Sequence, residues 1–235
     1  MLKSAGETDK RQGGISEEAI VDRIFDAVVE QRLPPGTKLS ESALCEAFGA
    51  GRMRVRRSLL LLASRDIVDL QSNRGAYIAS PTPEQAREVF EARRSIEPNV
   101  ARLAVERARK ADIADLKRHL AEESASQKNG DRRLTIRLSG QFHVRLAEIA
   151  GNVILIRMVK ELVTRTSLII GMFGASGGAD CADDEHLEIL RAFRAKDPEM
   201  AAQLMRAHLN HIEAEIDLTA DNAAKVDLVT LFKQG

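Results

Sequence analysis

Apolar residues recur at three- and four-residue intervals along the first part of the chain, with polar residues between them. This spacing predicts an amphipathic helix over residues 16–31, which the proline turn at residues 33–36 ends. Ser40 is a suitable N-cap for a second helix, and the glycine turn at residues 49–51 leads into a third. Two helices, a glycine turn and a further helix are the order of a helix-turn-helix unit.

The third helix combines a narrow apolar stripe with a high density of arginine. Val55, Leu59 and Leu62 follow one another at i, i+4 and i+7, which predicts the side that faces the core. Four arginines lie outside this stripe: Arg52 and Arg56 to one side of it, and Arg54 and Arg57 pointing further out. A helix of this kind is typical of a DNA-reading element.

Two short apolar runs follow, at residues 67–70 and 76–79, and they predict two strands. The residues between them have turn chemistry and a basic tip at Arg74 and Gly75. A hairpin at this place is the wing of a winged helix-turn-helix domain.

From residue 84 to about residue 218 the apolar pattern is helical throughout. Thr82 and Gln85 form a capping box with Pro83 at the first helical position, which predicts the start of a long helix and a domain boundary. Breaks near residue 110 and at 129–130, 151–152, 171–178 and 196–198 divide the segment into about six helices. The predicted fold is mainly α, with a winged helix-turn-helix domain followed by an all-α helical bundle.

We expect three parts: a disordered N-terminal tail over residues 1–14, a DNA-binding domain over residues 15–80, and an all-helical ligand-binding and dimerisation domain over residues 81–235. In the last part, apolar residues between 226 and 232 indicate a short helix that packs on a partner subunit. The glycine-rich loop at 171–178 lacks the Gly-Lys-Ser/Thr ending of a phosphate cradle, so we interpret it as a connector.

The chain has 235 residues, of which 44% are hydrophobic and 30% charged, and its net charge is zero. Affinity for nucleic acid must therefore come from a local patch, and six arginines against two aspartates between residues 50 and 80 provide one. Cys45 and Cys181 lack metal-site spacing and are expected to be free thiols. Without a segment typical of a signal peptide or a membrane span, we expect a cytoplasmic protein with no membrane partner.

Three histidines form the second candidate site. His143, His186 and His208 each lie on the apolar side of a different predicted helix. A single histidine in such a place is usually a core residue with satisfied hydrogen bonds, but three could converge on one metal ion through imidazole nitrogens. His211, one position beyond the apolar stripe, is the weaker alternative ligand, and His119 is expected at the surface.

Several spaced motifs, taken together, resemble GntR-type transcriptional regulators of the FadR subfamily over about residues 16–218. They are the stretches LPPGTKLSESALCEAFG, GRMRVRRSL, NRGAYI, FEARRSIEP, QFHVRLAEIAGN, DDEHLEIL and MRAHL, in this order.

The resemblance implies DNA contacts at Arg52 and Arg56, which match the two family arginines of the recognition helix, and a minor-groove approach by the wing tip at Arg74 and Gly75. The family usually has serine, proline and an acidic residue where this chain has Gly51, Arg54 and Arg57, so extra phosphate contacts are expected from the two arginines. Family members act as homodimers that bind two half-sites of an operator.

The resemblance also implies a divalent metal ion in the helical domain. The metal-binding branch of the family uses an Asp, a His four residues later and two further His, and these histidines match His143, His186 and His208. The Asp position holds Ser139, which leaves a three-histidine site that favours zinc or nickel and has open positions for a water or an effector oxygen. A small carboxylate would fill them, with its far end on Arg93.

Two other functions fit part of the pattern. A direct metal sensor would keep the DNA binding and use the ion itself as the signal. A helical metalloenzyme would use the histidines to activate water. The enzyme is disfavoured because the chain has no HExxH motif and because Glu185, adjacent to His186, is expected on a different helix face.

Overall fold

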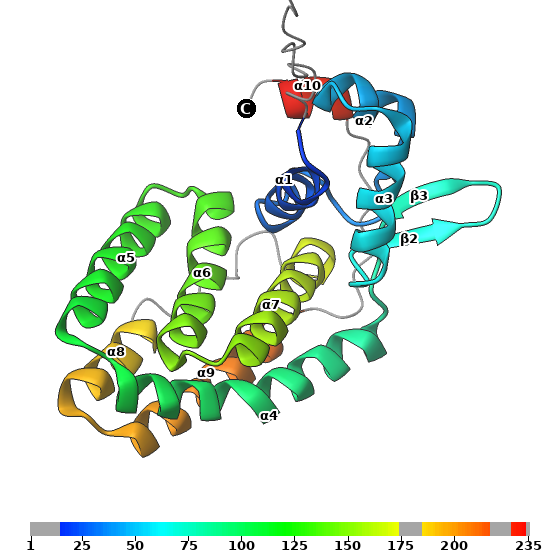
Figure 1. The fold of residues 1–235 in the computed structure, drawn as a ribbon. Helices are drawn as coiled ribbons and strands as arrows, with labels where there is room; N and C mark the ends of the chain where they lie inside the picture. Colours follow the sequence, from blue (N-terminus) through cyan, green and yellow to red (C-terminus); the bar gives the residue numbers. More distant parts are fainter. Residues whose placement is uncertain (1–14, 174–184, 217–226, 234–235) are drawn as a thin grey trace, which may run out of the picture.

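The computed structural model describes residues 15–173, 185–216 and 227–233. The first part forms the predicted winged helix-turn-helix, which we call the winged domain (Figure 1). Its elements are α1 (Glu17–Val29), β1 (Lys38–Leu39), α2 (Glu41–Phe48), α3 (Arg52–Ala63), β2 (Val68–Gln71) and β3 (Gly75–Ile78).

Local hydrogen bonds explain where the helices of the winged domain begin and end. The hydroxyls of Ser16 and Ser40 accept hydrogen bonds from backbone N–H groups three residues later, which caps α1 and α2. Gly49 ends α2 in the left-handed conformation, with φ of 59°, where a side chain would be strained. The predicted N-cap at Ser40 and the glycine turn are therefore confirmed.

The sheet has one more strand than the predicted hairpin. Its order is β1-β3-β2, and both pairings are antiparallel. Strand β1 pairs Lys38 with Tyr77 and contains only two residues, so no alternating pattern marks it in the sequence. The β2–β3 hairpin projects from the body of the molecule as a wing (Figure 1).

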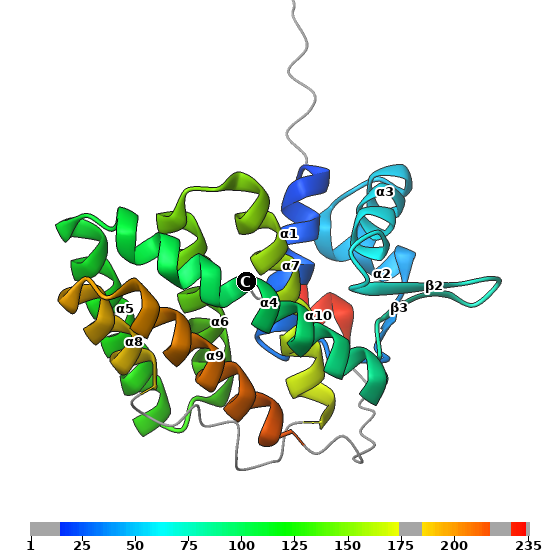
Figure 2. The same ribbon diagram turned by 90° about the horizontal axis from the view of Figure 1, so that it is seen from below.

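Among its described residues the helical domain contains six helices, in line with the prediction of about six. The capping box between Thr82 and Gln85 is present, and α4 and α9 run alongside each other over much of their length (Figure 2). No helix among the described residues is long and apolar enough to cross a membrane. The elements are α4 (Pro83–Arg107), α5 (Lys110–Lys128), α6 (Arg132–Ala150), α7 (Val153–Phe173), α8 (Glu185–Ala195) and α9 (Pro198–Ala214).

The predicted break at Gly171 is wrong, because α7 continues to Phe173. Ile169 and Phe173 are buried with Phe90 in one apolar cluster, and this packing offsets the low helix propensity of a single glycine. The rest of the predicted connector, residues 174–178, lies outside the described residues.

Helix α7 also joins the two domains. Leu168 is buried in the apolar core of the winged domain, although it belongs to the helical domain in sequence. Beside it, Arg165 pairs with Asp66 at 2.6 Å. On α6, Arg137 pairs with Glu30 at the end of α1, at 3.1 Å. Helices α6 and α7 thus contact the other helices of the helical domain and also the winged domain.

The last described helix, α10 (Leu228–Lys233), packs on α2 of the same chain. The ring of Phe232 lies 4.8 Å from the ring of Phe48, measured between centroids. Lys233 pairs with Glu46 at 2.7 Å. The expected range 81–235 grouped this segment with the helical domain, but its two buried apolar residues complete the core of the winged domain.

Candidate DNA-reading surface and metal centre

Helix α3 presents most of its arginines to solvent. Arg52 and Arg57 are exposed, and Arg57 pairs with Glu17 of α1 at 3.3 Å. Nε of Arg56 lies 2.9 Å from both carboxylate oxygens of Glu41 on α2. These are surface ion pairs, which are weak in water, so the guanidiniums can exchange them for phosphates or base edges.

Arg54 differs from its neighbours. We expected it to point outward, but it is half-buried and its Nη1 donates to the carbonyl of Ile15 at 3.0 Å. The reason is its place next to Val55 of the core stripe, on the side of α3 that packs against α1. In this position Arg54 links the recognition helix to the start of α1.

The wing tip is open to solvent, as its polar sequence indicates. Arg74 and Gly75 are both exposed. Gly75 has φ of 100°, a conformation that L side chains rarely adopt, so glycine is needed at this turn. Tyr77 donates its hydroxyl proton to the carbonyl of Arg74 at 3.3 Å, which holds the base of the turn.

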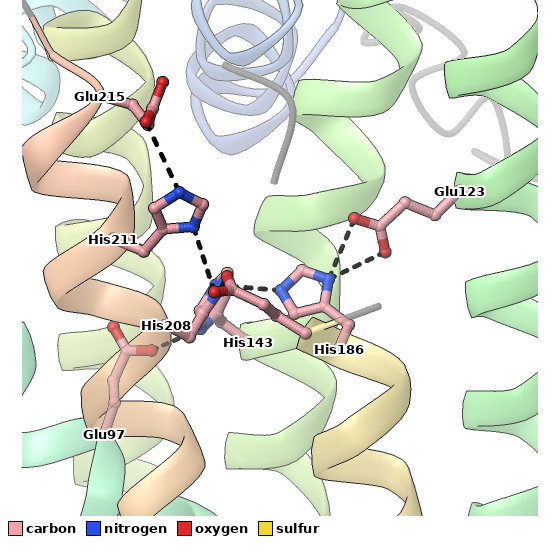
Figure 3. Close-up of polar contacts among 8 residues, drawn as sticks. Glu97, Glu123, His143, His186, His208, His211 and Glu215 are labelled. Atoms are coloured by element: carbon pink, nitrogen blue, oxygen red, sulfur yellow. Dashed lines mark hydrogen bonds and ion pairs between the residues drawn. The ribbon is translucent and has the colours of Figure 1, made fainter. Parts of the chain in front are cut away.

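The three predicted histidine ligands meet in the centre of the helical domain (Figure 3). His143 comes from α6, His186 from α8 and His208 from α9, and all three are buried. Nε2 of His208 lies 3.1 Å from Nε2 of His186 and 3.3 Å from Nε2 of His143. One candidate ligand atom of each residue therefore lies within 4.8 Å of the others.

Each of these rings also contacts a carboxylate through its other nitrogen, Nδ1. The pairs are His143 with Glu97 at 2.5 Å, His186 with Glu123 at 3.0 Å, and His208 with Glu185 at 2.7 Å. An ionised carboxylate only accepts hydrogen bonds, so each Nδ1 carries a proton and donates it. In a neutral ring, Nε2 then carries no proton, and its lone pair faces the other two rings.

Burial and neighbouring charges keep the centre in this state. Burial alone would raise the pKa of Glu97, but Arg93 and His143 outweigh it and lower that pKa to about 2. Burial lowers the pKa of His143 to about 4, despite the opposing effect of Glu97. Burial, followed by the two neighbouring rings, lowers the pKa of His208 well below its usual value. Glu97 is thus ionised and both rings are neutral at pH 7.

This arrangement fits a divalent metal ion. Three lone pairs that point at one another in a buried space repel unless a positive charge lies between them. Imidazole nitrogen is a good ligand for zinc and nickel, and a carboxylate on the outer nitrogen is the usual way in which a protein fixes a metal-binding histidine. The protein supplies all three nitrogens and all three carboxylates from its own chain.

A small cavity of about 40 Å³ opens beside His143. Ser139, where the resemblance leads us to expect an aspartate, lies on its wall, and so do Thr166 and His211. Arg93 also lines it, but this side chain is buried and donates to both oxygens of Glu97 and to the hydroxyl of Thr166. A ligand that enters without side-chain movement must be small.

His211 and Glu185 lie differently from expectation. His211 is not part of the nitrogen cluster, because its Nδ1 donates to Glu185 at 3.1 Å and its Nε2 faces Glu215 at 3.5 Å. Glu185 was expected on a different helix face from His186, and its contact with His208 was not predicted. As the first residue of α8, it has room to reach across to α9, where its two oxygens bind His208 and His211.

The prediction that His119 lies at the surface was also wrong. Its ring is buried between α5 and α6, and Nε2 donates to the carbonyl of Leu138 at 2.8 Å. Burial lowers the pKa of this ring, so it stays neutral. It does not contribute to the nitrogen cluster.

Sequence reasoning found the three nitrogens but missed the carboxylates that orient them. Glu97 had a visible signal, because it ends the motif that begins at Arg93 and lies four residues from it on one helix face. Glu123 had none, since its partner His186 is 63 residues away.

Comparison with known proteins agrees with both halves of this description. The model of bacterial regulatory proteins of the gntR family matches residues 16–78, and the model of the FCD domain matches residues 88–211. The chain belongs to the GntR family. It is a DNA-binding transcriptional regulator with an FCD effector domain, and its relatives are regulators and not enzymes, which removes the metalloenzyme alternative.

Its relatives match over most of their length. The HTH-type transcriptional regulator LutR of Bacillus subtilis (strain 168) is 27% identical over 203 residues, which cover 77% of this chain and 92% of LutR. The HTH-type transcriptional repressor NanR of Edwardsiella tarda is 27% identical over 222 residues, 84% of each chain. The solved structure of E. coli McbR/YncC has a similar fold, with a TM-score of 0.77 at 22% identity over 84% of this chain and 95% of that one.

Proposed function

We propose that this GntR-family regulator is a homodimer whose operator affinity is set by a small carboxylate bound at a divalent metal ion in the FCD domain. His143, His186 and His208 would hold the ion. The observation that carries the proposal is the convergence of three Nε2 atoms whose rings are each fixed by a carboxylate on Nδ1. Such a donor set has a clear use as a metal site and little use as a purely structural core.

Zinc or nickel suits the nitrogen donors, and when bound the ion supplies open coordination positions that oxygen ligands can occupy. The cavity beside His143 provides the space for them, with the Ser139 side chain on its wall. A serine in place of a carboxylate adds no negative charge, so this cavity favours an anionic ligand more than one with an aspartate would.

Arg93 is our candidate for the far end of the ligand. Two of its nitrogens bind Glu97, and the third, Nη1, donates to the hydroxyl of Thr166, which also lines the cavity. A carboxylate that displaces this hydroxyl would gain a charge-assisted hydrogen bond without breaking the Arg93–Glu97 pair.

On the DNA side, we propose that Arg52 and Arg56 contact base edges in the major groove. Arg54 and Arg57 would add phosphate contacts, and the wing tip at Arg74 and Gly75 would approach the minor groove. Arg54 has the least freedom to do so, because it already donates to the carbonyl of Ile15. In a homodimer, two such surfaces bind two half-sites.

The connection between the two sites runs through α6 and α7. Both helices line the cavity, and both hold the winged domain through Arg137, Arg165 and Leu168. A ligand that shifts either helix therefore changes the placement of α3. Coupling of this kind usually amounts to about 1–3 kcal/mol, a change of roughly 5- to 150-fold in operator affinity.

The first test is the metal content of untagged protein purified without added metal. About one ion per chain is expected, with none in the His143→Ala/His186→Ala double variant. His211→Ala is the matched control, because this ring lies beside the cluster and outside it, and it should keep the ion. No ion in the parent protein would overturn the metal part of the proposal.

Operator affinity then separates the two kinds of signal. A small carboxylate that changes operator affinity only in metal-loaded protein supports the proposal. Operator affinity that follows free metal with no organic ligand would instead identify the ion as the signal. A carboxylate effect that persists in the metal-free double variant would remove the ion from the mechanism.

A further inference from the structure

The solvent face of α3 has an apolar side chain at its centre. Met53 is 65% exposed, while Val55, Leu59 and Leu62 are buried. At about 100° per residue, Met53 lies roughly 180° around the helix from Leu62, directly opposite the buried stripe. It is also the second residue of the helix, in the N-terminal turn that reaches bases in helix-turn-helix proteins.

Positive charge surrounds this methionine. Arg56 and Arg57 follow it at i+3 and i+4, so both side chains are its neighbours on the helix surface, and Arg52 precedes it. All three arginines are exposed. Guanidiniums on both flanks of Met53 complement the phosphates on both sides of a groove, which makes double-stranded DNA the occupant that this face fits.

Single exposed apolar residues are common and need no explanation by themselves. Met53 is different because of its place: it lies on the solvent face of the N-terminal turn of a recognition helix, the part that loses water when the helix enters the major groove. A thioether has no hydrogen to donate and accepts only weakly, so it offers bases almost only apolar contact. The C5-methyl group of thymine is the apolar feature of the major groove.

We propose that Met53 reads the C5-methyl group of a thymine in each operator half-site. This inference rests on the proposed function, in which α3 enters the major groove. It assigns a separate task to each type of side chain on the helix: arginines for guanines and phosphates, and methionine for one thymine.

The experiment removes the methyl group alone. An operator is first selected from random-sequence duplexes with the full-length wild-type protein, and each conserved thymine is then replaced by deoxyuracil. One symmetric pair of replacements should weaken binding by wild type about three- to fivefold per half-site, the value for one lost methyl contact. Replacing cytosine by 5-methylcytosine at the same position of a T-to-C operator should restore part of the loss.

The Met53 variants complete the cycle. Met53→Ala removes the contact, and Met53→Gln keeps the length of the side chain but replaces the thioether with an amide. Each variant should bind the thymine operator and the operator with deoxyuracil at that position with equal affinity. Both variants should keep the wild-type melting temperature because the side chain is exposed.

The outcomes separate the two ideas. Suppose that wild type selects an operator, but each replacement of thymine by deoxyuracil lowers the operator affinity of wild type and of Met53→Ala by the same factor. Met53 then does not read thymine, and the inference fails while the proposed function stands. If wild type selects no sequence at all, or if Arg56→Ala selects the same operator with equal affinity, the proposed function of α3 fails first.

Discussion

Each domain of the protein contains an arginine held by both oxygens of one glutamate, in opposite environments. In the winged domain the side chains of Arg56 and Glu41 are 59% and 38% exposed. In the helical domain those of Arg93 and Glu97 are each 2% exposed. The two pairs have similar chemistry and differ in their exposure to solvent.

Water makes the first pair easy to break. Exposed ion pairs contribute little to stability, so Arg56 can leave Glu41 for DNA at small cost. The second pair has no water to replace a lost partner, so each charge depends on the other. The winged domain thus keeps its candidate functional groups exposed on a fold held by an apolar core, whereas in the helical domain the candidate functional groups are part of the core.

The largest difference between the two pairs should appear with the same substitution in each. Glu97→Gln keeps the size of the side chain but leaves Arg93 buried without a counter-charge, and we expect the free energy of unfolding in urea to fall by about 3–5 kcal/mol. Glu41→Gln should leave it unchanged within error, and should strengthen DNA binding because Arg56 is released. Equal losses in the two variants would show that burial does not separate the pairs.

A smaller loss is expected where α6 and α7 touch. A Cβ added at Gly140 would lie 2.8 Å from Cγ1 of Val163, a stiff β-branched side chain. Gly140→Ala should therefore lower the free energy of unfolding by about 1–3 kcal/mol. Adding Val163→Ala relieves the clash, so the free energy of unfolding of the double variant should fall by less than the sum of the losses in the two single variants. Strictly additive losses would contradict this packing.

The pH dependence of stability should carry a contribution from His119. Burial lowers the pKa of this ring below its ordinary value of about 6.5. Below that pH the unfolded chain takes up a proton that the folded chain does not hold, so the free energy of unfolding decreases as pH falls toward the folded-state pKa. His119→Gln keeps a donor for the Leu138 carbonyl and should reduce the slope between pH 7 and pH 5, measured by urea unfolding. An unchanged slope would contradict it.

The smallest effect on stability is expected at the exposed arginines, where the effect on DNA is distinct. Arg56→Ala and Arg57→Ala should both keep the wild-type melting temperature. Arg56→Ala should lose discrimination between operator and unrelated DNA. Arg57→Ala should lower the affinity for all DNA sequences alike, and should reduce the slope of log affinity against log salt concentration by about 1. Identical behaviour of the two variants would contradict the separate roles.

Local signals made the starts of α2 and α4 predictable. Ser40 caps α2 through a hydrogen bond three residues away, and Thr82 and Gln85 cap α4 in the same way. Arg54 was misplaced because its partner, the carbonyl of Ile15, lies 39 residues earlier. The contact of Glu185 with His208 was missed because a helix face is well defined only inside the helix, and this residue is at its first position.

The sequence by itself determined the order of the helices, the stripe of apolar residues in α3 and the three inward histidines, because each depends on spacing within a few residues. Only the tertiary structure decided which carboxylate orients each ring, that α10 completes the core of the winged domain, and that α6 and α7 both line the cavity and contact the winged domain. These contacts link residues far apart in the chain, and pairing at such distances is set by how helices pack together, which no local pattern encodes.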